Sequence, residues 1–128
     1  MTDMIIDKET ITGQIIGKAN NYRAVVNRKT KRIAIIKDKS VTAYERSFLA
    51  QCSIYKDRLI SKPFILNVTV FCNTVRYDLD NSLKTLLDCL QQARAITNDS
   101  LCYGINAVKC IDKENPRVTF SIEVYTGQ

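Results

Sequence analysis

From Phe64 to Cys72, every second side chain is apolar, and the positions between them include the polar Asn67 and Thr69. This period of two is typical of a β-strand with one buried face. A different pattern follows Asp80, where leucines recur every three or four residues as far as Ala93. That spacing is typical of an amphipathic helix, and Asp80 stands where an N-cap residue belongs. We therefore predict a central strand over residues 64–72 and a helix over residues 81–94, ending near Arg94.

The rest of the chain carries shorter patterns of the same two kinds. Tyr44, Phe48 and Cys52 recur at helical spacing and predict a first helix over residues 41–58. We also predict strands over residues 11–17, 22–26, 33–36, 105–111 and 117–125, the last of which alternates apolar side chains on one face. The polar tract at residues 27–32 suits a hairpin turn, and residues 112–116 join the last two predicted strands. The fold class expected is α+β, a mostly antiparallel sheet with two helices packed on it. No repeat or Pro/Gly-rich linker interrupts residues 1–128, so we expect a single domain.

Composition narrows the possible chemistry. With 128 residues, 45% apolar and 25% charged, the chain is large enough for one buried core. It contains no histidine, which excludes Ser-His and Cys-His nucleophile pairs and His-ligated zinc. The five cysteines form no C-x-x-C pair. We expect them to be reduced and mostly buried, with a zinc or thiol-redox role as the alternative.

The sequence gives no indication of a membrane or secretory segment. Its longest uncharged stretch, residues 63–75, is too short to span a bilayer. Asp3 and Asp7 stand where a secretory signal would carry basic residues. We therefore expect a cytoplasmic protein with no membrane partner.

Positive charge is concentrated in the first half of the chain. Residues 1–62 contain 13 basic and 6 acidic side chains, whereas residues 63–128 contain 6 and 7. The basic excess is densest between residues 18 and 39, at Lys18, Arg23, Arg28, Lys29, Lys31, Arg32, Lys37 and Lys39. Such a cluster favours a polyanionic partner, and the alternative is a solvated hairpin with a basic tip.

Two carboxylates, Asp78 and Asp80, stand between the predicted central strand and the helix. Two like charges held close repel each other unless a cation lies between them, and carboxylate oxygens suit Mg²⁺ or Mn²⁺. Lys84 follows Asp80 by four residues, so its ammonium could stabilise charge on a phosphate near that cation. The alternatives are a helix cap with a surface acid, and an ion-pair ladder of Lys84 with Asp80 and Asp88. Asp99 lies in a polar loop, where a turn role is the default.

These residues together resemble the signature of the RusA-type crossover-junction endodeoxyribonucleases. The likeness runs without a gap through the segment 78–81, Lys84, Asp88, Leu90 and Asp99. It implies that Asp78, Asp80 and Asp99 bind a divalent metal and that Lys84 assists catalysis. It also implies a homodimer that cuts four-way DNA junctions symmetrically. Asn20 and Asn21 resemble N-terminal features of the family. The residues expected to contact DNA are Lys18, Asn20, Asn21, Arg23, Arg28, Lys29, Lys31, Arg32 and Arg76.

The predicted helix sets a distance between the acids. A straight helix over residues 81–94 is about 21 Å long, and the five steps from Arg94 to Asp99 span at most roughly 17 Å. Asp99 can therefore barely reach Asp80 of the same chain. We therefore expect either an earlier helix end or a site completed by Asp99 of the partner subunit.

The resulting hypothesis is a Mg²⁺-dependent nuclease, with Mn²⁺ as a plausible substitute, that resolves Holliday junctions in DNA recombination and repair. Its expected partners are branched DNA and a second copy of the chain, in a bacterium or its phage, with no nucleotide cofactor. One alternative is a non-catalytic nucleic-acid binding protein that uses the basic hairpin. Another is an enzyme acting on nucleotides, which is disfavoured because the phosphate-binding pattern G-x-x-x-x-G-K-[ST] fails at Thr12 and Ala19.

Overall fold

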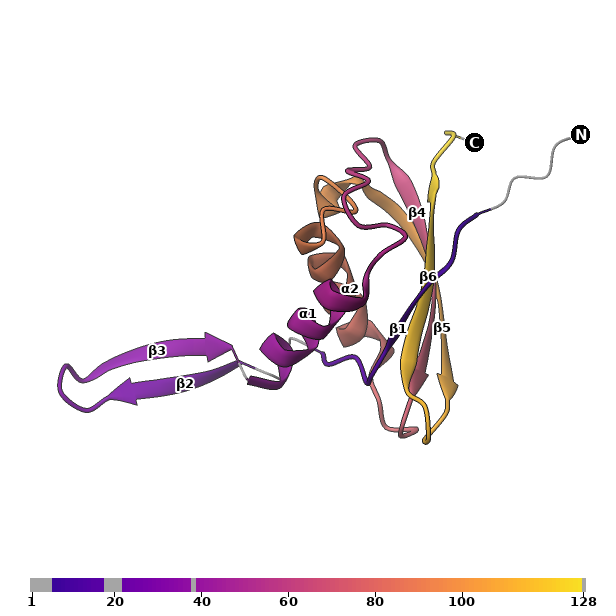
Figure 1. Cartoon of the computed structure of the whole chain (residues 1–128). Helices are drawn as coiled ribbons and strands as arrows, with labels where there is room; N and C mark the ends of the chain where they lie inside the picture. The colour runs from indigo at the N-terminus through magenta and orange to yellow at the C-terminus, as the bar shows by residue number, and fades with distance from the viewer. Residues whose placement is uncertain (1–5, 18–21, 38, 128) are drawn as a thin grey trace, which may run out of the picture.

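The computed structural model describes residues 6–17, 22–37 and 39–127, and within the second range it describes the side chains of residues 26–33. Two helices cover one face of a four-stranded sheet, and a separate two-stranded hairpin extends away from them (Figure 1). The elements are β1 (Glu9–Thr12), β2 (Tyr22–Asn27), β3 (Arg32–Lys37), α1 (Lys39–Gln51), β4 (Phe64–Cys72), α2 (Leu79–Gln92), a 3₁₀ turn (Asp99–Leu101), β5 (Cys102–Ile111) and β6 (Arg117–Val124). The predicted α+β class with two helices is confirmed.

The main sheet has the strand order β1-β6-β4-β5. β6 pairs antiparallel with both β1 and β4, whereas β5 pairs parallel with β4. The parallel pair requires a crossover, and α2 supplies it. β4 matches the predicted strand and buries every second side chain under the helices. β5 forms an edge of the sheet.

Several predicted boundaries were wrong, among them the start of β5, which lies at Cys102 and not at residue 105. Three predicted ends differ for a local reason. The first strand ends at Thr12 because Gly13 adopts a positive φ of 106°, and residues 14–17 leave the sheet. α1 ends at Gln51 because the buried carboxylate of Glu9 accepts the backbone N–H groups of the next residues, including Ile54 at 2.8 Å. α2 ends at Gln92, and Arg94 then has a φ of 60°.

The hydrophobic core lies between the helices and the sheet. Phe48 of α1 stacks on Phe120 of β6, with ring centroids 6.0 Å apart. Tyr55, in the segment between α1 and β4, packs on the same ring at 5.6 Å. All five cysteines are free, and Cys52, Cys72 and Cys89 are buried, as expected for small apolar side chains. In the described part of the chain, no helix is both long enough and apolar enough to cross a membrane.

The β2–β3 hairpin forms a small sheet of its own. In Figure 1 it projects on the helix side of the molecule, away from the main sheet. Asn27 closes its turn by accepting the N–H of Lys31 on its carbonyl at 2.7 Å and that of Lys29 on its side chain at 3.0 Å. The hairpin therefore carries its turn away from the core, where a large partner can reach it.

Candidate functional site

An extended strap, residues 14–17, crosses the junction between β4 and α2. The Tyr77 hydroxyl donates to the carbonyl of Ile15, and the Thr85 hydroxyl donates to the carbonyl of Ile16 at 2.6 Å. Burial raises the pKa of Tyr77. Its hydroxyl therefore stays protonated and remains a donor. These bonds hold the strap against the segment before α2 and against α2 itself.

Gly17 ends the strap against the first turn of α2. A Cβ at this position would lie 2.5 Å from the Cβ of Asn81, closer than real Cβ contacts allow. Asn81 in turn donates from its amide nitrogen to Asp78 Oδ2 at 3.2 Å. Only glycine permits this approach, and the strap is thereby coupled through Asn81 to the first candidate carboxylate.

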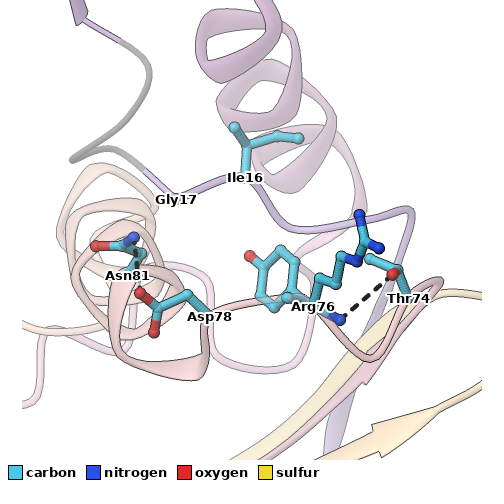
Figure 2. A pocket seen from close by; sticks show the side chains of 7 residues that line it. Ile16, Gly17, Thr74, Arg76, Asp78 and Asn81 are labelled. Carbon is cyan, nitrogen blue, oxygen red and sulfur yellow. Dashed lines mark hydrogen bonds between the residues drawn. The ribbon is translucent and has the colours of Figure 1, made fainter.

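Asp78 and Asp80 lie at the N-terminal end of α2, and both side chains are exposed. Asp78 occupies the N-cap position, and Asp80 belongs to the first turn, so the prediction of Asp80 as the N-cap was wrong. Asp78 makes no side-chain capping bond. Figure 2 shows its carboxylate turned toward Asn81. The Asp78 oxygens are thus held beside the helix end without being used to cap it.

Lys109 fixes the loop that leads to Asp78. Its ammonium, on β5, donates to the carbonyls of Val75 at 3.0 Å and Tyr77 at 2.9 Å. This contact joins the C-terminal end of β5 to the segment before the candidate acids. Sequence reasoning missed Lys109, as it missed the strap, because a single lysine in an apolar strand gives no sign of which carbonyls it will meet.

A pocket of about 350 Å³ opens next to Asp78, lined by Ile16, Gly17, Thr74, Arg76, Tyr77, Asp78 and Asn81. Arg76 is exposed. In Figure 2 its guanidinium and the Asp78 carboxylate point to opposite sides of the pocket. A cation and an anion therefore flank one opening, an arrangement that suits a phosphate on one side and a metal ion on the other.

Lys84 lies one turn after Asp80 on the same side of α2, and its side chain is exposed. Residues four apart on a helix are neighbours. Lys84 takes part in none of the ion pairs found among the described residues, so the ladder with Asp80 and Asp88 that was an alternative is not formed there. Its ammonium is available to a ligand near the helix end.

Asp99 lies at the other end of α2. It begins the 3₁₀ turn before β5, its side chain is exposed, and its backbone N–H donates to Gln91 Oε1 at 3.0 Å. α2 has 14 residues and is about 21 Å long. Asp78 and Asp80 therefore lie at one end of α2, and Asp99 lies at the other end.

No group of three or more acidic or cysteine side chains that could hold a metal ion occurs among residues 6–17, 22–37 and 39–127 of one chain. Two exposed carboxylates nevertheless fit Mg²⁺, which usually keeps several waters and takes only one or two carboxylates plus substrate phosphates. Asp78 and Asp80 could hold such an ion, with the third acid coming from elsewhere.

The expected DNA-contacting residues are distributed over the hairpin and the pocket. Arg28, Lys29, Lys31 and Arg32 surround the hairpin turn with exposed side chains. Arg23 lies on β2. Arg76 lies at the pocket beside Asp78. Lys18, Asn20 and Asn21 lie outside the described residues.

Comparison with known proteins decides the relationship of this chain. A family model described as "Endodeoxyribonuclease RusA" matches residues 13–123. The chain belongs to the RusA endodeoxyribonuclease family. The match runs from the strap into β6 and so includes every candidate site residue. The chain is also 29% identical over 112 residues to "Crossover junction endodeoxyribonuclease RusA" of Aquifex aeolicus (strain VF5), covering 86% of this chain and 85% of that protein. The resemblance drawn from the sequence is confirmed. Membership of an endodeoxyribonuclease family also argues against the alternative of a non-catalytic nucleic-acid binding protein.

Proposed function

We propose that this chain is a divalent-metal-dependent endonuclease that resolves four-way DNA junctions by paired, symmetric cleavage during recombination and repair in a bacterium or its phage. Membership of the RusA family supports the nuclease chemistry. The relative from Aquifex aeolicus, which is named for crossover junctions, supports the substrate. The observation that carries the proposal is the pair of exposed carboxylates at the start of α2, of which Asp78 lines a pocket together with Arg76.

Each residue has a defined task in this proposal. Asp78 and Asp80 hold the metal ion, with Asn81 orienting Asp78. A divalent ion at this position would lower the pKa of a water molecule and offset charge on the scissile phosphate. Lys84, one turn along α2, stabilises negative charge that develops on the phosphate in the transition state. Arg76 and the hairpin turn hold flanking phosphates and fix the position of the DNA.

In this proposal, Asp99 is supplied by a second subunit. Because Asp99 lies at the far end of α2, the proposed site takes this acid from the partner chain. A homodimer then contains two complete sites, and two cuts can be placed symmetrically on a two-fold junction.

The direct test compares four-way, flap and linear duplex DNA of matched arm sequence, with Mg²⁺, with Mn²⁺ and with chelator. We expect paired nicks at symmetric positions in the four-way junction, only when metal is present. Equal cutting of all three substrates would contradict junction resolution and leave a general nuclease. Binding without cleavage under every metal condition would overturn the catalytic proposal.

A further inference from the structure

The β2–β3 hairpin presents two apolar side chains to solvent beside its turn. Val26 of β2 and Ile33 of β3 are direct partners across the strands, next to the residue pair that closes the turn. Their side chains are 59% and 70% exposed. Single exposed apolar side chains are common on protein surfaces, but two cross-strand partners form a continuous patch. We name Val26 and Ile33 the hairpin pair.

Packing within the chain does not account for the hairpin pair. The hairpin is a two-stranded sheet of its own, and in Figure 1 it extends away from the main sheet and from both helices. Among the described residues, the pair belongs neither to the buried core nor to the partly buried side chains packed against it. A two-stranded hairpin without a packed face is at best marginally stable in water. The pair is therefore placed for a partner outside the chain.

The charges around the hairpin pair indicate the chemistry of that partner. Residues 22–37 contain six basic side chains and no acidic one. Those with exposed side chains at the turn are Arg28, Lys29, Lys31 and Arg32. A surface of this kind repels a second copy of the same hairpin and attracts a polyanion. Nucleic acid offers both kinds of contact, because its phosphates are anionic and apolar side chains can pack between its bases.

The dimensions of the hairpin allow it to reach bases. Each strand has six residues, so the hairpin is about 20 Å long. In an intact duplex every base pair is covered by its neighbours, and an apolar side chain must separate two of them to enter. At a branch point the helices are interrupted, so the last base pair of an arm gives up its stacking neighbour at lower cost. The branch point is therefore the part of the DNA that the hairpin pair enters most easily.

We propose that the hairpin enters the centre of a branched DNA and places the hairpin pair against the faces of the base pairs at the branch point. This inference rests on the proposed function in taking branched DNA as the partner. The cations of the turn bind phosphates on either side, and Val26 and Ile33 replace stacking that is lost between the arms. Because linear DNA offers no such gap, the apolar contact favours a junction over a duplex of the same charge.

A tryptophan reporter tests the insertion without reference to cleavage. The chain contains no tryptophan, so Ile33→Trp introduces a single indole on the hairpin. Stacking on bases quenches indole emission. With Ca²⁺ in place of Mg²⁺, we expect a four-way junction to quench this emission strongly and a linear duplex of the same sequence to quench it weakly. Leu49→Trp is the matched control, because Leu49 is exposed on α1 and its indole should keep its emission with either DNA.

Three results of this experiment would overturn the inference. Equal quenching by junction and duplex would show that the hairpin contacts any DNA in the same way. Junction binding without quenching would show that the hairpin pair stays outside the bases. A blue shift of the Ile33→Trp emission that grows with protein concentration in the absence of DNA would place the pair against another protein chain.

Two polar substitutions test the apolar contact by a different measurement. Val26→Thr with Ile33→Thr keeps β-branched side chains and every charge, so the hairpin and the salt dependence of binding should be preserved. Junction affinity should fall about tenfold because two apolar contacts are lost, whereas duplex affinity should stay within about two-fold. Val124→Thr with Ile54→Thr is the control, since these side chains are also exposed, at 52% and 40%, but lie outside the hairpin.

The DNA itself reports the same event. A 2-aminopurine base at the branch point emits more strongly when it loses its stacking neighbour. At saturating protein, we expect this emission to rise with the parent and with the control variant, and to rise much less with Val26→Thr, Ile33→Thr. If the hairpin variant keeps both the parent's preference for junctions and the parent's 2-aminopurine signal, the apolar contact is refuted.

Cleavage separates this inference from the proposed function. If Ile33→Trp nicks junctions symmetrically with Mg²⁺ but shows no quenching with Ca²⁺, the insertion alone is refuted. If the junction quenches the indole but no metal condition gives nicking by the parent protein, the catalytic proposal alone is refuted. A protein that binds no branched DNA contradicts both.

Discussion

At the scale of single residues, the candidate site depends on side chains that are exposed yet held in place. Asp78 occupies a helix N-cap but leaves the helix amides without its carboxylate, which is oriented by Asn81 instead. Helix N-termini stabilise negative charge, so the carboxylate pair is tolerated there before any metal binds.

We predict that Asp80→Asn lowers junction cleavage at least about 100-fold, since loss even of groups that only support a metal ligand costs 10–100-fold. Junction binding in the presence of Ca²⁺ or chelator should remain within a few-fold, because the phosphate-contacting residues are unchanged. Gel-shift and cleavage assays on one labelled junction measure both. Asp7→Asn, which alters an exposed acid near β1, is the control and should retain full activity. Equal loss in both variants would argue against a metal-binding role.

The acids and Lys84 were singled out from their spacing along the chain, and their roles in the site stay a prediction. Glu9 and Lys109 could not be predicted. Glu9 is buried and accepts backbone N–H groups from residues 53–55, more than 40 positions away. Lys109 meets carbonyls that precede it by more than 30 positions. Such contacts exist only after the chain has folded, and no local period encodes them.

At the scale of elements, the hairpin is separated from the core and carries charge at its turn. Val26 and Ile33, which pair across its strands, are 59% and 70% exposed, so core burial does not explain the element. Its exposed basic turn instead provides a surface for a polyanion. We therefore expect substitutions in the hairpin to change DNA affinity with little effect on the stability of the fold.

Replacing Arg28, Lys29 and Lys31 by glutamine should weaken junction binding and reduce its salt dependence. Each lost phosphate contact lowers the slope of log affinity against log salt by about 0.9, so the slope should fall by up to about 3. Fluorescence anisotropy at several NaCl concentrations measures it, with Lys8, Lys56 and Lys62 replaced by glutamine as the charge-matched control. If the control loses as much affinity and slope as the turn variant, the hairpin has no special part in binding.

Elements in which apolar residues recur regularly could be located from the sequence. β4 matches its predicted bounds because every second residue from Phe64 to Cys72 is apolar, and the hairpin strands were predicted to within one residue at each end. The segment after α1 was misassigned as helix because Cys52 and Tyr55 continue the helical spacing. Both are buried as the spacing suggests, but the Glu9 carboxylate binds the backbone there and ends the helix.

At the scale of the whole molecule, strand order was beyond sequence reasoning. Nothing local indicates that β6 lies between β1 and β4, or that β4 and β5 run parallel. Which strands pair depends on how many apolar side chains the complete sheet buries. The hydrophobic pattern of a single segment does not contain this information. The split of the acids between the ends of α2 could be anticipated because it follows from length alone.

The distribution of thiols gives a test of the whole fold. Burial, reinforced by the neighbouring Glu9 carboxylate, raises the pKa of Cys52 to about 12, and burial also raises the pKa of Cys72 and of Cys102. A raised pKa leaves little thiolate below it, and thiolate is the reactive form. At pH 8 we expect Cys52, Cys72 and Cys89 to be silent toward a thiol reagent in the native protein. All five thiols should react in guanidinium chloride, and fast native labelling of the buried three would contradict this core.

The central place of β6 has a consequence for how the protein is made. The ribosome delivers β1 first and β6 last, yet β6 is the strand that joins β1 to the rest of the sheet. While residues 64–111 emerge, β4, α2 and β5 can associate as a unit, but β1 has no strand to pair with. A nascent chain stalled before Arg117 would therefore display an unfinished sheet, and termination between β5 and β6 should be as damaging as termination within β4.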